Sequence, residues 1–382
     1  MLEPLLYTVD PQNYSTYLNE KIQTTLTLFD AAGLAHPSPE IHASAKENFR
    51  SRAEFCIFKE GDTFSFSFSM FKGKGKDRER ISLFQFPMAS KPINMAMTLL
   101  IKYLPRHEVL YKRVFSCEFL SSRTGEVTVS LNYRRPLDEA TWLSEARSLK
   151  KEMSDEGLCC DFIGRAHKQQ ISADTDSVLE TLNTDDGGEY KLYEVNGTFS
   201  QPNAGVACHM VSFARSCAAD CLDSDLLELY CGSGTFTVCL ADRFSKVLAT
   251  EVARIPTKTA FLNLKTNNIK NVKIVRLSAE EVSEALNGVR EFFRLKEADV
   301  SINDYNFKTL LIDPPRCGLN DERALSFTAE FDRVIYISCN PVTLIEDLKY
   351  LTKTHDIERL AFFDQFPYTP HLESGVLLKR RV

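Results

Sequence analysis

Apolar residues follow two different spacings along the 382-residue chain, one typical of helices and one typical of strands. Apolar positions recur at helical period over residues 14–32, and the following Gly33 predicts the end of this helix. Within residues 49–86 phenylalanines alternate with small polar residues, which is the period of a half-buried strand. A further alternating strand is predicted over residues 127–133, and a capped helix over residues 138–151. Together these elements predict an α+β domain in the N-terminal half.

Buried strands alternate with helices in the rest of the chain. A polar, acidic segment over residues 173–189 predicts the boundary, so we expect one domain over residues 1–190 and another over residues 191–382. A series of β-α units joined by right-handed crossovers gives a doubly wound sheet with helices on both faces. The sequence therefore predicts an α/β fold for the second domain. Its expected strands cover residues 226–230, 247–252, 272–277, 309–312, 334–337, 359–363 and 375–378.

The composition is that of an ordinary globular protein, with 43% hydrophobic and 26% charged residues. No apolar run approaches the roughly 18 to 20 residues that span a bilayer, and the first residues lack the pattern of a secretion signal. Eleven cysteines without a CxxC pair indicate reduced thiols rather than a disulfide framework or a metal site. We therefore expect a cytoplasmic protein that holds no metal and binds no membrane.

The net charge of −6 conceals a basic region in the N-terminal half. Residues 46–151 hold 20 Lys and Arg against 12 Asp and Glu, whereas the remainder of the chain is acidic. The basic region includes a loop in which glycines separate Lys72, Lys74 and Lys76, and such a loop can follow nucleic-acid phosphates. A solvated hairpin tip is the alternative for the loop. The uneven charge indicates a polyanion-binding surface in the N-terminal domain.

A turn with two glycines follows the first strand of the doubly wound domain. Gly232 and Gly234 lie between residues 226–230 and a predicted helix, where the backbone of such sheets closely approaches a nucleotide cofactor. Glu251, 19 residues after Gly232, ends the second strand and supplies a carboxylate for ribose hydroxyls. Asp313 leads into two prolines at a strand end, and this rigid turn forms either a pocket floor or a purely structural corner. These residues indicate a nucleotide cofactor without distinguishing a dinucleotide from S-adenosylmethionine.

A cysteine lies where another buried strand ends. The apolar run over residues 334–337 stops at Ser338-Cys339-Asn340, which is how a parallel strand opens onto a catalytic edge. A thiol at this edge can attack an electrophilic carbon, whereas a thiol that faces the core is only a small hydrophobic group. The motifs around Cys339 favour the first interpretation.

Eight short motifs occur in one order in the C-terminal half. They are Ser200-Gln-Pro-Asn203, Leu227-Glu-Leu-Tyr-Cys-Gly232, Val247-Leu-Ala-Thr-Glu251, Asn287-Gly-Val-Arg-Glu-Phe292, Asp313-Pro-Pro-Arg316, Ile337-Ser-Cys-Asn-Pro341, Phe363-Asp-Gln-Phe-Pro-Tyr368 and His371-Leu-Glu-Ser-Gly375. Through them the chain resembles the uracil-5-methyltransferases of tRNA over almost its whole length. The resemblance implies a Rossmann-like class I methyltransferase sheet at the C-terminus, an N-terminal α+β RNA-binding domain, and S-adenosyl-L-methionine as the cofactor.

The resemblance also implies roles for individual residues. Cys339 is the implied nucleophile and Glu373 the implied general base. The family's glycine-rich turn usually carries asparagines where this chain has Ser233 and Thr235, from which we expect an altered cofactor affinity. The implied contacts to the cofactor come from Gln201, Tyr230, Gly232, Thr235, Glu251 and Asp313.

The implied reaction methylates carbon 5 of a uridine in the T loop of tRNA, at position 54, and in the tRNA-like part of tmRNA. Attack of Cys339 on carbon 6 makes carbon 5 nucleophilic, and Glu373 later removes the proton from carbon 5. The base must be turned out of its stack, so we expect Phe199 to hold it and Arg316 to bind the uracil or a neighbouring phosphate. A core phenylalanine is the alternative for Phe199, and an exposed surface acid is the alternative for Glu373. We expect the enzyme to be a monomer.

Three other functions remain open at this point. A uracil-5-methyltransferase of ribosomal RNA commonly carries an additional N-terminal barrel and iron–sulfur cysteines, for which this chain offers neither the length nor the cysteine spacing. An RNA-folding or RNA-binding protein with a methyltransferase fold is the second alternative, and release of tritium from carbon 5 of labelled uracil would decide against it. A nicotinamide dehydrogenase shares the glycine turn but has no use for the Cys339 and Glu373 pair.

Overall fold

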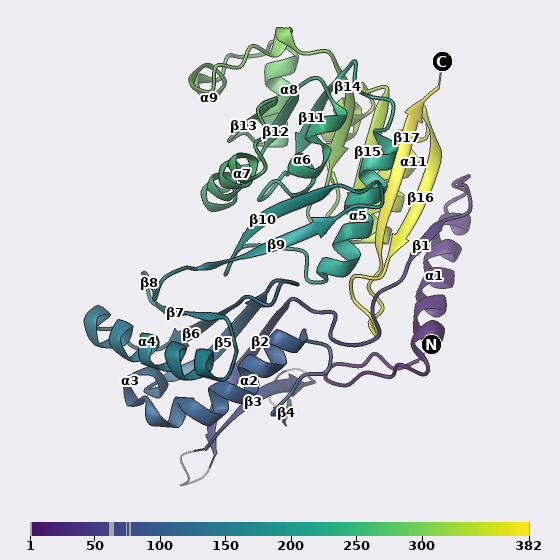
Figure 1. Ribbon diagram of the computed structural model, residues 1–382. Helices are drawn as coiled ribbons and strands as arrows, with labels where there is room; N and C mark the ends of the chain where they lie inside the picture. The colour runs from purple at the N-terminus through teal and green to yellow at the C-terminus, as the bar shows by residue number, and fades with distance from the viewer. Residues whose placement is uncertain (1, 61–64, 74, 76–77, 382) are drawn as a thin grey trace.

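The computed structural model describes residues 2–60, 65–73, 75 and 78–381. It contains two large sheets, which lie one above the other in Figure 1, and a two-stranded hairpin between them. The expected alternation at residues 63–68 is described only from Ser65 onward, where Phe66 and Phe68 are buried. Of the three lysines in the basic loop, Lys74 and Lys76 lie outside the described residues.

The C-terminal sheet has eight strands in the order β1-β16-β17-β15-β14-β11-β12-β13. The five strands from β13 to β15 run parallel to one another, while β17 is antiparallel to both of its neighbours. This arrangement confirms the predicted Rossmann-like α/β fold with its doubly wound sheet. The strands are β1 (Glu40–His42), β11 (Asp225–Leu229), β12 (Val247–Thr250), β13 (Val272–Val275), β14 (Phe307–Ile312), β15 (Arg333–Ser338), β16 (His355–Phe363) and β17 (Glu373–Arg380).

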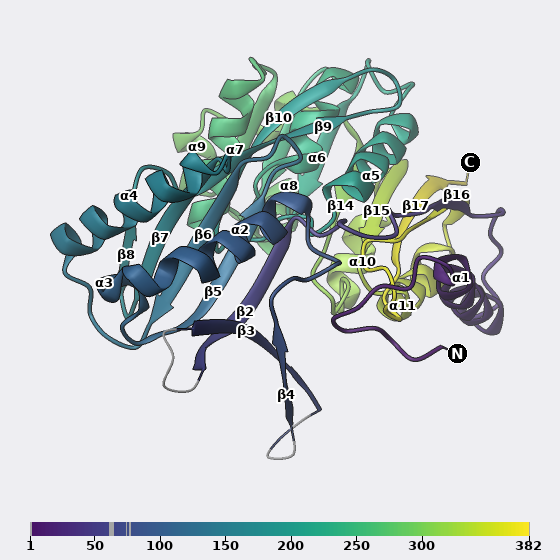
Figure 2. The same ribbon diagram turned by 60° about the horizontal axis from the view of Figure 1, so that its bottom comes forward.

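Helices cover both faces of this sheet, as Figures 1 and 2 show. One face carries α5 (Ala204–Cys217), α6 (Thr235–Leu240) and α7 (Arg254–Thr266), and α7 also packs against the hairpin strand β10. The alternating side chains of β15 explain why both faces are apolar, because Ile335 and Ile337 face one layer while Val334 and Tyr336 face the other. The other layer comprises α1 (Tyr14–Ala31), α8 (Ala279–Leu286), α10 (Glu322–Thr328) and α11 (Pro341–Leu351), with the short α9 (Phe293–Glu297) following α8.

The N-terminal sheet has seven strands in the order β4-β3-β2-β5-β6-β7-β8. Its helices, α2 (Lys91–Tyr103), α3 (Glu108–Tyr111) and α4 (Glu139–Asp155), cover one face, where Phe55, Phe119 and Trp142 are buried. This sheet is the predicted α+β unit. Its strands are β2 (Arg52–Glu60), β3 (Ser65–Lys72), β4 (Glu79–Leu83), β5 (Val114–Ser121), β6 (Val127–Tyr133), β7 (Cys160–Ala166) and β8 (Gln169–Ser172).

Residues 14–42 belong with the C-terminal sheet rather than with the N-terminal one. Strand β1 pairs in parallel with β16, and α1 packs against α11. The polar segment at residues 173–189 forms strand β9 (Ser177–Asn183), which pairs with β10 (Glu189–Val195) in the hairpin between the sheets. The C-terminal sheet uses residues 40–42 and 225–380, and the N-terminal sheet uses residues 52–172. The division into two domains at residue 190 stays a prediction.

Candidate active site

The glycine turn after β11 has a backbone that side chains rarely adopt. Gly232 and Gly234 have φ values of +55° and +82°, and a Cβ atom on Gly232 would meet nothing within 4 Å. Tyr230 also has a positive φ, of +60°, which is strained for a residue with a side chain. The turn therefore leaves open space beside its backbone, at the end of a central strand where cofactors bind in such sheets.

A pocket brings together six of the residues predicted from the sequence. It lies between the glycine turn and the segment that follows β10. The side-chain carbonyl oxygen of Gln201 is buried and has no hydrogen-bond partner among the described residues. A buried acceptor without a partner fits a ligand that brings its own N–H donor, such as an amino acid ammonium group. The six predicted residues that line the pocket are Phe199, Gln201, Tyr230, Gly232, Thr235 and Asp313.

The segment that carries Phe199 and Gln201 is held by the N-terminal sheet. Arg52 of β2 donates a hydrogen bond to the carbonyl oxygen of Thr198 at 2.6 Å, and Arg165 of β7 donates one to the carbonyl oxygen of Asn196. Phe199 itself is 69% exposed at the pocket, so the alternative of a core phenylalanine is wrong. The predicted RNA-binding sheet thus contacts the wall of the cofactor pocket directly.

Glu251 lies just after β12 and supports the glycine turn. Its carboxylate accepts hydrogen bonds from the backbone N–H of Gly232 at 3.1 Å and of Ala253 at 2.8 Å. A carboxylate has about four acceptor positions, so these two bonds leave capacity for ribose hydroxyls. The contact to Gly232 shows why an acid lies at this spacing, while the ribose contact stays a prediction.

Cys339 and Glu373 lie beside each other because of the reversed strand. Cys339 directly follows β15, Glu373 is the first residue of β17, and Ser338 and Ser374 are partners in the antiparallel pairing of these strands. Glu373 is only 5% exposed, so the alternative of an exposed surface acid is wrong. Burial is the main cause that raises the pKa of Glu373 to about 8, and Asp313 adds to it. Burial, followed by the charges of Glu373 and Asp313, also raises the pKa of the Cys339 thiol. The Arg316 guanidinium has the opposite effect and lowers this pKa.

A third buried carboxyl, Glu228, was missed in the sequence. It lies in β11, is 1% exposed, and burial together with Asp313 raises its pKa to about 8. Burial likewise raises the pKa of Asp313 to about 7. The only acid within the otherwise apolar run 226–229 was the available signal. These carboxyls along one sheet edge favour a cationic ligand, and S-adenosylmethionine with its sulfonium and ammonium groups fits that requirement.

Arg316 is exposed at the same edge. Its guanidinium lies 3.3 Å from Nδ1 of His371, two residues before Glu373. Its carbonyl oxygen accepts hydrogen bonds from the side chains of Asn340 and Thr343, at 3.0 and 3.2 Å. The turn that begins at Asp313 is thereby fixed to the start of α11, next to Cys339.

None of the described helices is long and apolar enough to cross a membrane. Histidine, cysteine and carboxylate side chains of the described residues form no group of three that could hold a metal ion.

The fold and the pocket define an S-adenosylmethionine-dependent methyltransferase. Comparison with known proteins specifies the family, since the model of the tRNA (uracil-5-)-methyltransferase family matches residues 13–381. The chain belongs to this family. It is 43% identical over 373 residues to the tRNA/tmRNA (uracil-C(5))-methyltransferase of Vibrio vulnificus strain YJ016, covering 98% of both chains. The enzyme of the same name from Photobacterium profundum is 44% identical over 369 residues, covering 96% of this chain and 97% of that one.

A solved structure shares the fold. It is the tRNA (uracil-54, C5)-methyltransferase of Pyrococcus abyssi in complex with S-adenosyl-L-homocysteine. The TM-score is 0.69 at 20% sequence identity, and the match covers 96% of this chain and 83% of that chain. Both the methyltransferase sheet and the N-terminal region therefore have counterparts in that structure.

Proposed function

We propose that the protein transfers a methyl group from S-adenosylmethionine to carbon 5 of a uridine in the T loop of tRNA, at nucleotide 54, and in the tRNA-like part of tmRNA. The observation that carries the proposal is that Cys339 and Glu373 lie at the adjoining ends of the paired strands β15 and β17, and that Asp313, which lines the pocket, raises the pKa of both. The names of the relatives support the same substrate, since they are tRNA/tmRNA (uracil-C(5))-methyltransferases.

The cofactor would be held by the residues that line or support the pocket. Gln201 offers its unpartnered carbonyl oxygen, Glu251 offers acceptor positions for ribose, and the turn at Gly232 leaves its backbone open. Tyr230, Thr235 and Asp313 complete the wall. When bound, S-adenosylmethionine supplies an electrophilic methyl group on a positively charged sulfur.

Cys339 and Glu373 perform the two steps that the uracil ring requires. The thiolate of Cys339 forms a bond to carbon 6, and the electron pair of the carbon 5–carbon 6 double bond moves to carbon 5 and the carbonyl oxygen at carbon 4. Carbon 5 is then nucleophilic enough to accept a methyl group. It afterwards carries both the methyl group and its original proton. Glu373 takes this proton, the double bond re-forms, and the bond from carbon 6 to Sγ of Cys339 breaks.

The protonation states of both groups set a requirement on pH. Glu373 acts as a base only when ionised, and its pKa of about 8 means that much of it is protonated in the empty enzyme at neutral pH. Cys339 must also lose its proton, and the nearby Arg316 guanidinium favours the thiolate. Both steps therefore become faster as the pH rises.

The RNA would be held by exposed groups around this edge and on the N-terminal sheet. Phe199 offers an exposed ring for stacking on the turned-out uracil, and Arg316 offers a guanidinium for the base or a phosphate. The basic region at residues 46–151 supplies further phosphate contacts. We propose that the enzyme acts in the cytoplasm, as a monomer and without a metal.

A denaturing gel tests the roles of the two catalytic residues. Cys339→Ala removes the nucleophile, so no covalent protein–RNA species should form even when RNA binds. Glu373→Gln leaves thiol attack and methylation possible but removes the base. A slow-migrating band that carries both RNA and the methyl label should then persist, while turnover is greatly reduced.

Two outcomes would contradict the assignment. These are normal turnover by Glu373→Gln and a covalent band with Cys339→Ala. Mapping of 5-methyluridine at nucleotide resolution, after incubation of tRNA with the enzyme, identifies the target position. If 5-methyluridine appeared only in ribosomal RNA and not in tRNA, the substrate would be ribosomal RNA instead of tRNA.

A further inference from the structure

A buried lysine near the start of the chain holds the loop that leads to Glu373. Lys21 lies in α1 and is 5% exposed. Its ammonium donates hydrogen bonds to the carboxylate of Asp364 and to the carbonyl oxygens of Phe366 at 3.1 Å and His371 at 3.0 Å. An ammonium group has three donors, so this set of partners satisfies it completely.

Asp364, the partner of Lys21, is fully buried and held on every side. Its other carboxylate oxygen accepts a hydrogen bond from the Tyr14 hydroxyl at 2.7 Å. The Tyr14 oxygen in turn accepts a bond from the backbone N–H of Ser44 at 2.8 Å. The backbone N–H of Asp364 donates to the carbonyl oxygen of His42 at 3.0 Å. The charge pair is therefore fixed by the N-terminal segment, hundreds of residues away in sequence.

The loop in question connects β16 to β17 and ends one residue before Glu373. The Lys21 contacts reach both of its ends, because Asp364 directly follows β16 and His371 lies two residues before Glu373. Within the loop Tyr368 has a φ of +63°, a conformation that must be maintained by its surroundings. The N-terminal segment provides part of this support, since the backbone N–H of Leu5 donates to the carbonyl oxygen of Tyr368 at 3.0 Å.

We propose that Lys21 is a positioning residue for Glu373, which fixes the loop 364–372 so that the carboxyl of Glu373 reaches the proton on carbon 5 of the substrate. The inference rests on the proposed function of Glu373 as the base. Movement of residues 366–371 away from Lys21 would leave two of the three donors of a buried ammonium without partners, which disfavours other arrangements of the loop.

The turn that carries the nucleophile has hydrogen bonds of its own, separate from the contacts of Lys21 and Asp364, which we call the brace. Cys339 lies in a turn held by its own neighbours, where the Ser338 hydroxyl and the Asn340 backbone are bonded to each other. Loss of the brace should therefore affect proton removal far more than thiol attack. A residue with a merely structural role would slow both steps together.

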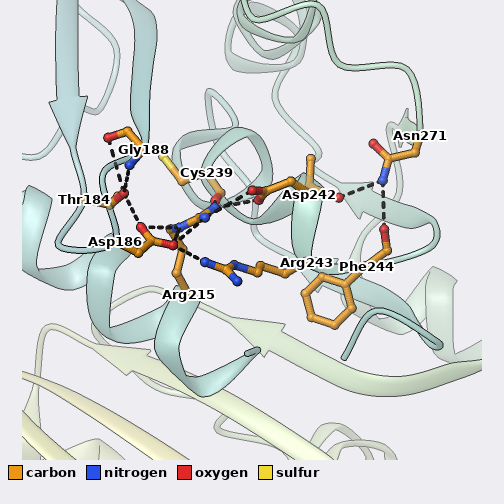
Figure 3. Close-up of polar contacts among 10 residues, drawn as sticks. Thr184, Asp186, Gly188, Arg215, Cys239, Asp242, Arg243, Phe244 and Asn271 are labelled. Carbon is orange, nitrogen blue, oxygen red and sulfur yellow. Dashed lines mark hydrogen bonds and ion pairs between the residues drawn. The ribbon is translucent and has the colours of Figure 1, made fainter. Parts of the chain in front are cut away.

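A second buried brace supplies a matched control. Arg215 of α5 lies between Asp186, at the tip of the β9–β10 hairpin, and Asp242, and it also donates to the carbonyl oxygen of Cys239 (Figure 3). Arg215 is likewise about 5% exposed on its side chain. Its partners are the hairpin tip and the end of α6, not the loop 364–372.

The test compares two double variants in a single turnover with tRNA labelled in the target uridine. Lys21→Met with Asp364→Asn removes the brace without leaving a lone buried charge, and Arg215→Met with Asp186→Asn is the control. In the first variant, the covalent methylated adduct should form within about threefold of the wild-type rate and decay on the order of tenfold to a hundredfold more slowly, since small misplacements of a catalytic group have effects of that size. The control should show a lower melting temperature but no accumulated adduct.

The inference is overturned if adduct formation and decay slow equally in the brace variant, if decay is unchanged, or if the control also accumulates adduct. Should the double variant not fold, Tyr14→Phe decides, because it removes one hydrogen bond to Asp364 and keeps the charge pair. Slower decay with unchanged formation supports the brace, and an unchanged ratio of the two rates overturns it. If the wild-type enzyme methylated uridine without forming any adduct on Cys339, the proposed chemistry itself would be wrong. If the adduct accumulated in Glu373→Gln but not in the Lys21→Met, Asp364→Asn variant, only the role of the brace would be wrong.

Discussion

Glu373 should make the stability of the protein depend on pH. Its carboxyl is 5% exposed, and its pKa rises from 4.5 to about 8, chiefly because of burial. A carboxyl whose pKa is higher in the folded than in the unfolded state stabilises the fold fully below the unfolded pKa, and this contribution is lost as the pH rises through the folded pKa. Glu373→Gln keeps a neutral group of similar shape at every pH. The variant should therefore become progressively more stable than the wild type between about pH 5 and pH 9.

The size of the effect follows from the pKa. Each pKa unit corresponds to about 1.4 kcal/mol, so the rise from 4.5 to about 8 gives a limit of roughly 5 kcal/mol above pH 8 and roughly 3 kcal/mol at pH 7. Repulsion from Asp313, the second cause of the raised pKa, contributes part of this free energy.

Urea unfolding at a series of pH values measures the difference. The control is Glu358→Gln, which removes a solvent-exposed carboxyl paired with Lys379 on the surface and should show no such growing gap. Parallel stability curves for wild type and Glu373→Gln would refute the reasoning, because they would mean that Glu373 binds the same number of protons in the folded and unfolded states.

Three further predictions concern ligands. Glu251→Ala should weaken binding of S-adenosylhomocysteine about tenfold to a hundredfold in calorimetric titration, because charge-assisted bonds worth roughly 1.5 to 3 kcal/mol are lost, while RNA affinity is retained. Neutralising Lys72, Lys74 and Lys76 together should weaken tRNA binding and flatten its salt dependence, and an unaltered salt slope would assign the loop to a solvated tip. Activity should survive exhaustive chelation, and its loss with recovery on adding a divalent ion would contradict this, unless the ion only restores the folding of the tRNA.

The strand pattern and the glycine turn were predictable because both are local properties of the sequence. The apolar runs specify buried strands, and the spacing between Gly232 and Glu251 agrees with their contact in the structure. The reversed direction of β17 was not predictable, because it depends on pairing with β15 and β16 rather than on its own residues. Because β17 runs opposite to β15, its first residue, Glu373, lies at the same edge of the sheet as Cys339.

Other features depended on contacts that a local pattern does not contain. The period of α1 predicts an apolar face but not its partner, so its position beside α11 could not be inferred. The polar residues of β9 predicted a domain boundary rather than a strand, because that strand lies between two sheets and is only half-buried. Glu228 was not predicted, because an acid in a strand interrupts the apolar pattern and so indicates an exposed position, whereas Glu228 is buried beside Asp313.

The pairing of β1 with β16 has a consequence for biosynthesis. Glu40 is paired with Ala361, so β1 has no partner until the segment that forms β16 has left the ribosome. The N-terminal sheet, which draws on residues 52–172, has its own buried core and can form while synthesis continues. Until β16 arrives, β1 keeps an unpaired edge and α1 an uncovered apolar face, and nascent chains are open to aggregation or to chaperones at these two places. The catalytic edge needs both β15 and β17, so it can assemble only after these two strands have been made.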